Sequence, residues 1–533
     1  MIRVQNIKLN LDEPLQALPR KICKALNIKE SDILGYKIFK EAIDARKKND
    51  IKLVYTIDVE TTKEEKLLSK SGVMKADSME YVFPSKGEEK LDYSPIVVGS
   101  GPCGLFAALI LAQAGYKPIV LERGKDVDAR VKDVDEFWRT GKLNPISNVQ
   151  FGEGGAGTFS DGKLTTQIKN KRCHKVLEEM ALAGAPPEIL YKNKPHVGTD
   201  ILRSVVKNIR EKIIKLGGEF RFESKVTSIN IEDKKIKSVV VNEKDIIETN
   251  ICIFAIGHSA RDTFEMLSKN RVDMIQKPFS VGMRIEHKQE LINISQFGEM
   301  NKDNERLGAA EYKLVHHCQN GRTVYSFCMC PGGYVIGSAS EEGRLVTNGM
   351  SEHSRDGENA NSAILVNVGP NDFEGDDPLA GMYLQRELEE KAFKLGGENF
   401  NAPCQLVGDF VKNVPSTTQG SVKPTYTPTV KYTNMRPSLP TFVGDAISEA
   451  IQAFGNKIQG FGNEDAVFTG FETRSSSPVR ILRAQDGCMS NIGGLYPAGE
   501  GAGYAGGITS AAVDGIQVAE AIINKYMPLT DMK

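Results

Sequence analysis

Hydrophobic residues are spaced differently in the N-terminal part of the chain than in the rest of it. Alternating apolar and polar positions in Ile2–Leu9 and Lys52–Val59 predict β-strands, whereas the spacing in Pro14–Leu26 and Glu64–Lys70 predicts helices. A charged stretch with turn-forming residues, Pro84–Lys90, comes next. The pattern therefore predicts a small α+β domain followed by a linker.

From Tyr93 onward, short and wholly apolar runs alternate with longer apolar segments. The run Ile96–Val98 predicts a buried strand, Leu105–Ala114 a helix and Pro118–Leu121 a second strand. This order is typical of a β-α-β unit with parallel strands. A further strand is predicted at Ile251–Gly257.

Residues 271–465 differ again, because alternating segments and turns predominate there. Strands are predicted within Lys313–Tyr334 and Ala363–Val368, and a helix at Pro378–Leu395. The last seventy residues return to glycine-rich loops and end in one predicted helix, Thr509–Lys525.

Composition narrows the class of protein. The 533 residues include 68 Lys and Arg against 69 Asp and Glu, a net charge of −1, and 40% are hydrophobic, which excludes a disordered chain. A near-neutral chain without an Arg-rich stripe is not expected to bind nucleic acid. No apolar run is long enough to cross a bilayer, no secretory signal is recognised, and the nine cysteines are scattered. A cytoplasmic protein without a membrane partner is expected.

Fifty glycines are present, and three clusters of them carry the chemistry. The first cluster has G-x-G-x-x-G spacing at Gly99, Gly101 and Gly104, between a predicted strand and helix, and Glu122 ends the next predicted strand. In a dinucleotide-binding unit these glycines make the tight turn, admit the pyrophosphate and let the helix pack closely. The carboxylate of the acidic residue accepts hydrogen bonds from the ribose hydroxyls. It would repel the 2′-phosphate of NADP, so NADP is not expected at this site.

The other two clusters lie far away in the sequence. Phe151–Gly162 repeats the glycine spacing but is not followed by a helix, so it suits close approach to a flat or phosphate-bearing ligand, or else is a flexible surface loop. Gly493–Gly507 leads directly into the last predicted helix, whose N-terminus would stabilise negative charge on a reduced flavin, or is simply a cap helix.

The motifs Gly99–Leu105 with Glu122-Arg123, Ile251–Gly257 and Gly494–Glu500 resemble the FAD motifs of the glutathione-reductase-type flavoprotein superfamily. The layout as a whole resembles a family of bacterial FAD-dependent dehydrogenases of unassigned substrate. A more distant likeness, through Glu472–Arg474 and Gly503–Gly507, is to the glucose-inhibited division protein A family of tRNA-modifying flavoproteins.

The predicted fold class is therefore α/β. A Rossmann-like FAD-binding domain is interrupted by a β-rich substrate domain and preceded by a small, ferredoxin-like α+β domain. The predicted boundaries are 1–88 for the N-terminal domain, 89–270 for the first part of the FAD-binding domain, 271–465 for the insertion and 466–533 for the C-terminal return.

Spacing and resemblance together predict the residues that contact FAD. They are Gly99, Gly101, Pro102, Gly104, Glu122, Arg123, Gly154, Gly155, Gly157, Thr158, Gly257, Gly499, Glu500, Gly506, Gly507 and Ile508.

Candidates for the chemistry beside the flavin are weaker. Two arginines bracket a run of serines in Arg474–Arg480, which suits an anion or a solvated loop. His353 and Arg355 are candidates for an acid or base and an anchor, with His258 an equal contender. The catalytic group stays unknown.

Two further clusters contain thiol or imidazole groups that could bind a metal or take part in redox chemistry. Cys328 and Cys330 share one face of a predicted strand, which suits two core cysteines more than a redox pair. In His316-His317-Cys318, neighbouring strand residues point to opposite faces, so no metal site is expected.

We predict an FAD-dependent oxidoreductase that acts on an unidentified small-molecule substrate, with NAD(P)H as a candidate electron donor. No second dinucleotide fingerprint is present for that donor. Two alternatives remain: a tRNA-modifying flavoprotein, and a non-enzymatic FAD-binding module that recruits a partner through its N-terminal domain. The sequence does not indicate the oligomeric state.

Overall fold

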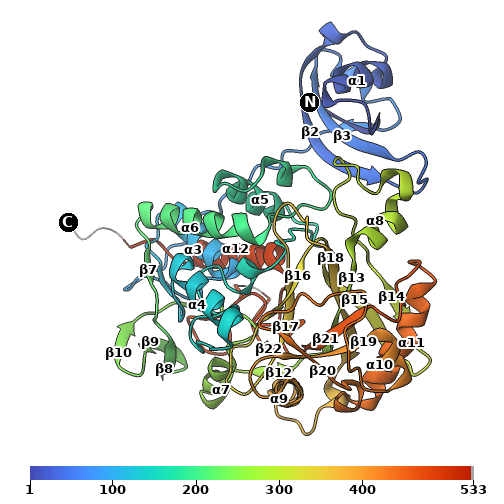
Figure 1. Cartoon of the computed structure of the whole chain (residues 1–533). Helices are drawn as coiled ribbons and strands as arrows, with labels where there is room; N and C mark the ends of the chain where they lie inside the picture. The colour runs from blue at the N-terminus through green and yellow to red at the C-terminus, as the bar shows by residue number, and fades with distance from the viewer. Residues whose placement is uncertain (486, 530–533) are drawn as a thin grey trace.

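The computed structural model describes residues 1–485 and 487–529 and contains three main sheets (Figure 1). The N-terminal sheet is antiparallel, with strand order β2-β3-β1-β4. Leu18, Ile22 and Leu26 are buried on one side of the first helix and pack with the apolar residues of this sheet. The elements in chain order are β1 (Ile2–Asn10), α1 (Leu18–Leu26), β2 (Ile33–Asp44), β3 (Lys52–Thr61), α2 (Glu64–Leu67) and β4 (Val73–Lys75).

The second sheet is parallel, with strand order β23-β11-β5-β6-β7. Four of its strands are apolar runs rather than alternating ones, which is typical of a parallel sheet covered on both faces, and the edge strand β7 is Glu-Phe-Arg. Their bounds are β5 (Ile96–Val98), β6 (Ile119–Leu121), β7 (Glu219–Arg221), β11 (Cys252–Phe254) and β23 (Leu495–Pro497).

Helices from distant parts of the chain cover the parallel sheet. α3, which is apolar all round, and α12 pack closely against each other, and α6 packs on α3. The helices of this region are α3 (Pro102–Gln113), α4 (Val127–Thr140), α5 (Arg172–Leu182), α6 (Thr199–Lys215), α7 (Arg261–Lys269) and α12 (Ile508–Lys525).

The third sheet has seven strands in the order β14-β15-β18-β13-β21-β19-β20. All its pairings are antiparallel except that of β19 with β20. Its elements are β13 (Phe279–Lys288), β14 (Val315–His317), β15 (Thr323–Cys330), β18 (Asn359–Val368), β19 (Ala402–Leu406), β20 (Val430–Tyr432), β21 (Val467–Glu472), α8 (Gln289–Phe297), α9 (Ala380–Gly396), α10 (Val407–Lys412) and α11 (Thr441–Gly455).

Three smaller sheets complete the fold. One is the antiparallel set β8 (Val226–Glu232), β9 (Lys235–Val241) and β10 (Asp245–Glu248). The others are the pairs β12 (Met274–Gln276) with β22 (Val479–Ile481) and β16 (Tyr334–Gly337) with β17 (Thr347–Met350). No helix in the described ranges has the length and apolar character needed to span a bilayer.

The predicted boundary at residue 465 is wrong. β21 pairs with β13 on one side and β19 on the other, so it is an inner strand of the seven-stranded sheet and not part of the C-terminal return. The chain rejoins the parallel sheet only at β23. All six residues of β21 are buried, but its sequence pattern does not show whether it belongs to the parallel or to the seven-stranded sheet, so its partner could not be read from that pattern.

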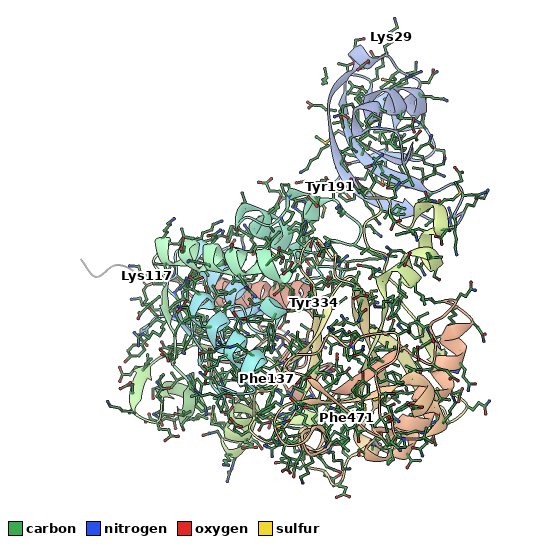
Figure 2. All side chains as sticks on the ribbon, viewed as in Figure 1. Lys29, Lys117, Phe137, Tyr191, Tyr334 and Phe471 are labelled. Carbon is green, nitrogen blue, oxygen red and sulfur yellow. The ribbon has the colours of Figure 1, made fainter. Side chains whose placement is uncertain are left out.

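The N-terminal sheet stands out from the rest of the molecule and touches it through few segments (Figures 1 and 2). The backbone N–H of Glu41 in β2 donates to the carbonyl of Tyr191, a residue labelled at this junction in Figure 2. Nearby, Arg306 donates to the carbonyls of Leu11 and Glu13 at 2.8 and 2.6 Å. The domain is thus held by hydrogen bonds at one end of its sheet and by Ile51, which belongs to the hydrophobic core of the seven-stranded sheet.

Candidate functional site

The site begins at the turn between β5 and α3. Gly99 follows the strand with a φ of 97°, and α3 begins at Pro102. A Cβ on Gly104 would lie 1.9 Å from the carbonyl oxygen of Gly99, so only glycine lets the helix start this close to the strand. The unpaired N–H groups and partial positive charge of such a helix start favour a phosphate.

Glu122, at the end of β6, connects three loops of the site. Its carboxylate accepts hydrogen bonds from the N–H and hydroxyl of Ser100 at 2.9 and 2.7 Å, from the N–H of Gly124 at 2.9 Å and from that of Gly152 at 3.0 Å. The side chain is 5% exposed and lines the cavity. It therefore holds the first and second glycine clusters together.

The second glycine cluster is an ordered loop built over a buried arginine that sequence analysis missed. Arg130 of α4 is fully buried and donates to the carbonyls of Asn148, Val149 and Glu153 at 2.8, 2.9 and 2.6 Å. Burial lowers the pKa of Arg130 to about 10. The guanidinium replaces the hydrogen bonds that this irregular backbone lacks, so the alternative of a flexible surface loop does not hold.

The third cluster joins β23 to α12. Asp514 of α12 accepts from the N–H of Gly499 at 2.7 Å and pairs with Arg483 at 2.6 Å, which fixes the loop against the helix. Burial raises the pKa of Glu500, in the same loop, to about 7. Gly507 has a φ of 110°, and a Cβ there would meet no atom within 4 Å, so the backbone is open toward a ligand.

Another wall of the site comes from the seven-stranded sheet and its neighbour β17. Cys328 has a φ of 42° and lies where the pairing of β15 with β18 shifts register. Arg284 donates to the carbonyl of Cys328 at 2.8 Å and pairs with Glu472 of β21 at 2.6 Å. This buried pair holds the strand irregularity in place, and Arg284 is a second functional residue that no sequence signal indicated.

One cavity connects all of these parts. Eleven of the predicted FAD contacts line it, namely Gly99, Gly101, Pro102, Glu122, Arg123, Gly155, Gly157, Gly257, Glu500, Gly507 and Ile508. Five others do not line it and lie in the same loops or at the start of α3: Gly104, Gly154, Thr158, Gly499 and Gly506. Glycines that leave open space at Gly257 and Gly507 give a flat ligand access to the backbone, so the residues present fit FAD.

The predicted anion site in Arg474–Arg480 does not form, which corrects that expectation. Arg474 lines the cavity, but its guanidinium donates to both oxygens of Glu389 at 2.9 and 2.8 Å and to the hydroxyl of Ser340 at 2.6 Å. Arg480 donates to the carbonyl of Gly503 at 3.1 Å. The guanidinium of Arg474 is thus committed to protein partners, and Arg480, whose Nε has no hydrogen-bond partner among the described residues, lies outside the cavity lining, so the two arginines do not form one anchor.

His353 and Arg355 lie outside the cavity lining. The ring of His353 stacks on that of His196 with centroids 5.0 Å apart. Arg355 pairs with Asp161 and with Glu311 at 2.5 and 3.0 Å, and Asp161 itself lines the cavity. Neither residue is placed as a direct acid, base or anchor, although Arg355 acts on the site through Asp161.

His258 does line the cavity, directly after Gly257. Burial, with Arg474 and Arg261 nearby, lowers the pKa of His258 to about 3. The imidazole is therefore neutral at ordinary pH and serves as a hydrogen-bonding group rather than a cation. The hydroxyl oxygen of Ser259 lies 3.2 Å from Nδ1 of His258.

Comparison with known proteins gives two family matches and one full-length relative. The family described as "FAD-dependent protein, C-terminal domain-like" matches residues 278–475, and a domain of unknown function (DUF8436) matches residues 1–60. The first match runs through β21, in agreement with its place in the seven-stranded sheet. An uncharacterised protein of Clostridium beijerinckii is 54% identical over 529 residues, which cover 98% of this chain and 99% of that protein.

Solved structures resemble the chain only distantly. An L-proline dehydrogenase of P. horikoshii is 12% identical, with a TM-score of 0.33, over 82% of this chain and 94% of that one. A glycine oxidase of Bacillus cereus is 11% identical, with a TM-score of 0.32, over 82% of this chain and 99% of that one. Similarity at this level leaves the reaction open.

The cofactor is clear from the family match and the cavity together: it is FAD. The chain belongs to the same family as this clostridial protein, which it matches over nearly the whole of both sequences.

Proposed function

We propose that the chain is an FAD-dependent oxidoreductase that moves two electrons between its flavin and an unidentified small molecule, with NAD(P)H as a candidate donor. One observation carries the proposal. The cavity that would receive FAD at the parallel sheet continues to Phe327–Cys330 and to Glu472, Arg474 and Ser475 at the seven-stranded sheet, and to Val346–Gly349 at β17. A protein that only stores FAD needs no second wall of this kind.

The residues present assign a part of the cofactor to each loop. The start of α3 and Glu122 would hold the diphosphate and ribose, and Gly155 and Gly157 would border the diphosphate. Glu500, Gly507 and the N-terminus of α12 would lie at the isoalloxazine, where a helix start stabilises negative charge. When bound, FAD supplies the two-electron chemistry.

The second wall supplies polar groups with hydrogen-bonding capacity to spare. Thr347 lines the cavity, is 1% exposed, and its hydroxyl has no hydrogen-bond partner among the described residues. Asn348 beside it uses its side-chain oxygen to accept from Arg284 at 3.1 Å. A buried hydroxyl without a partner costs free energy unless a ligand satisfies it, so Thr347 is placed to contact a substrate.

Three charged side chains on the cavity wall are already paired. Glu472 pairs with Arg284, Arg474 with Glu389, and Asp161 with Arg355. These side chains form the wall of the cavity and are not available to bind a charged substrate directly. They also exclude water from the flavin without placing an unpaired charge beside it.

Purification followed by anaerobic mixing tests the proposal. We expect a bound flavin spectrum, and bleaching by NADH, NADPH or a member of a substrate panel that is faster than for free FAD. A flavin-loaded protein that no donor reduces would instead be a non-enzymatic FAD-binding module. A protein that takes up no FAD at all would overturn the cofactor assignment too. The Thr347→Val variant should keep its flavin but lose activity with the correct substrate.

A further inference from the structure

Three potential metal ligands meet at the outer edge of the seven-stranded sheet. They are Nε2 of His316, Sγ of Cys318 and a carboxylate oxygen of Glu449, and all three atoms lie within 4.8 Å of one another. His316 belongs to β14, Cys318 follows that strand, and Glu449 belongs to α11. None of the three lines the FAD cavity, so this cluster is separate from the proposed reaction.

The alternation of side chains along the strand, from which no metal site was expected, places His316 and Cys318 on the same face. Neighbouring residues point to opposite faces, so His317 turns away from His316 and places its Nδ1 3.1 Å from the hydroxyl of Thr323. His316 and Cys318 are two residues apart and reach the same helix. Cys318 donates from its thiol to the carbonyl of Ala446, one turn before Glu449.

The cluster is preorganised without a metal. His316 Nε2 lies 2.8 Å from Oε1 of Glu449, and the N–H of Gln319 donates to both oxygens of that carboxylate. The turn after β14 is held by backbone hydrogen bonds between Cys318 and Arg322 and between Gly321 and Cys318. Little reorganisation is needed for the three groups to turn toward one centre.

The ligand chemistry selects the class of cation. A thiolate, an imidazole and a carboxylate are the ligands of Zn²⁺, at about 2.3 Å for sulfur and about 2.0–2.2 Å for nitrogen and oxygen. Mg²⁺ and Ca²⁺ prefer oxygen ligands and would not select the thiol. The side chains of His316 and Glu449 are 25% and 33% exposed, which leaves a fourth position open to water.

We propose that His316, Cys318 and Glu449 form a binding site for a Zn²⁺-like divalent cation. On binding, the Cys318 thiol gives its proton to solvent and a sulfur–metal bond forms. The proton between Nε2 of His316 and Glu449 passes to solvent, and Nδ1 of the neutral ring carries the one that remains, so Nε2 and a carboxylate oxygen each bond to the cation. The metal links the edge strand β14 to α11. No electron changes hands, so the cation acts as a structural clamp.

Cobalt provides the probe, because thiolate-bound Co²⁺ absorbs in the visible region beyond the flavin bands. CoCl₂ is titrated anaerobically into the full-length, FAD-loaded protein, whose cysteines are kept as thiols. We expect one equivalent of Co²⁺ to give thiolate-dependent bands that ZnCl₂ abolishes, and Zn²⁺ to raise the melting temperature.

The matched variants are Cys318→Ser, His316→Asn and Glu449→Gln against His317→Asn, the neighbouring imidazole on the other face. Cys318→Ser should lose the bands, and the other two ligand variants should bind at least about tenfold more weakly, as even outer-shell losses do at metal sites. His317→Asn should bind as the unaltered protein does.

Absence of the bands in the unaltered protein, or bands that survive in Cys318→Ser, would overturn the site. If Cys318→Ser fails to fold, the other two ligand variants serve as the test. An unchanged affinity for Co²⁺ in both His316→Asn and Glu449→Gln would also overturn the site. The flavin content of every sample is recorded beside the cobalt bands, so failure of the metal site and failure of the oxidoreductase proposal are read separately.

Discussion

At the scale of single residues, Glu122 makes the most distinctive set of contacts. Each carboxylate oxygen accepts two hydrogen bonds, from Ser100 on one side and from Gly124 and Gly152 on the other. In Glu122→Gln, one of these oxygens becomes an NH₂ group that faces donors only. Lost hydrogen bonds to a charged group cost about 1.5–3 kcal/mol, so FAD should bind about 10- to 100-fold more weakly.

Fluorescence titration of the apoprotein with FAD measures this loss. Glu223→Gln is the matched control, because Glu223 lies near the same turn with its side chain exposed. Equal affinities for FAD in the two variants would show that Glu122 does not organise the site.

A second residue-scale prediction concerns His287 of β13, which is 1% exposed. Its Nε2 lies 2.7 Å from the carbonyl of Phe461 and its Nδ1 has no hydrogen-bond partner, so protonation would bury an unpaired charge. Burial lowers the pKa of His287 to about 4. The unfolded chain, with a histidine pKa near 6.5, binds the proton first, so stability is complete above about pH 6.5 and falls as the pH drops toward 4.

His287→Gln should reduce the slope of unfolding free energy against pH in this window by about 1.4 kcal/mol per pH unit. Denaturant melts at a series of pH values measure the slope. His317→Gln, at an exposed position, should leave it unchanged. A slope that is equal in all three proteins would exclude a neutral, buried His287.

The residues around the flavin show what a sequence can and cannot indicate. Gly99 and Glu122 were predictable because a strand, a turn and a helix adjacent in sequence create their roles. Arg474 was not, since its role depends on Glu389, 85 residues away, which turns a candidate anchor into a structural ion pair. Arg130 likewise carries no local signal, as its partners are backbone carbonyls.

At the scale of elements, the contact between α3 and α12 sets the geometry of the site. A Cβ on Gly515 of α12 would lie 2.1 Å from the carbonyl oxygen of Cys103 in α3. Gly515→Ala should therefore push the helices apart and destabilise the protein by about 1–3 kcal/mol, even though alanine favours the helix itself.

Thermal melts of the apoprotein and its FAD content after reconstitution measure this effect. Gly455→Ala, in α11, is the control, because the nearest atom to its added Cβ is 3.7 Å away. The control should match or exceed the unaltered protein in stability. A Gly515→Ala protein that melts no lower than the control would contradict close packing of α3 and α12.

Elements were predicted better than their assembly. β5 was expected at Ile96–Val98 and is found there, and the last helix begins one residue before its predicted start. The predicted boundary at residue 465 left β21 outside the seven-stranded sheet, because the pattern of a buried strand does not specify which strand lies beside it. Long-range pairing is decided by complementarity between faces that a single sequence does not display.

At the scale of the whole molecule, a buried ion cluster joins α7, which follows the parallel sheet, to α9, which packs on the seven-stranded one. Glu389 of α9 accepts from Arg261 of α7 at 2.6 Å and from Arg474 at 2.8 Å. Burial alone would raise the pKa of Glu389, but the two guanidiniums outweigh it and hold the pKa well below its usual range.

Glu389→Gln leaves two buried guanidiniums without their carboxylate and should cost about 3–5 kcal/mol. Glu390→Gln, the next residue, removes only an exposed pair with Lys394 and should leave stability almost unchanged. Denaturant unfolding of both variants, followed by circular dichroism, measures the difference. Similar midpoints would mean that the cluster does not hold the two sheets together.

The N-terminal domain permits a last prediction. Among the residues that the structure describes, none before Val98 lines the cavity, and the segment from Gly87 to Glu89 is hydrogen-bonded to the end of α12. A chain that starts at residue 77 should keep its FAD. It should melt lower, because Ile51 belongs to the hydrophobic core of the seven-stranded sheet. The FAD-to-protein ratio and the melting temperature test both statements, and loss of FAD would refute the first.

The order of β5, β23 and α12 along the chain determines when the two sides of the FAD cavity are synthesised. The ribosome makes β5 and α3, and then the whole seven-stranded sheet, before β23 and α12. Glu500, Gly507 and Ile508, which line the cavity, therefore leave the ribosome long after the first glycine cluster does. A nascent chain exposes the apolar surface of α3 until then, so we expect FAD to bind only after α12 is made and a chain that ends before Leu495 to be colourless.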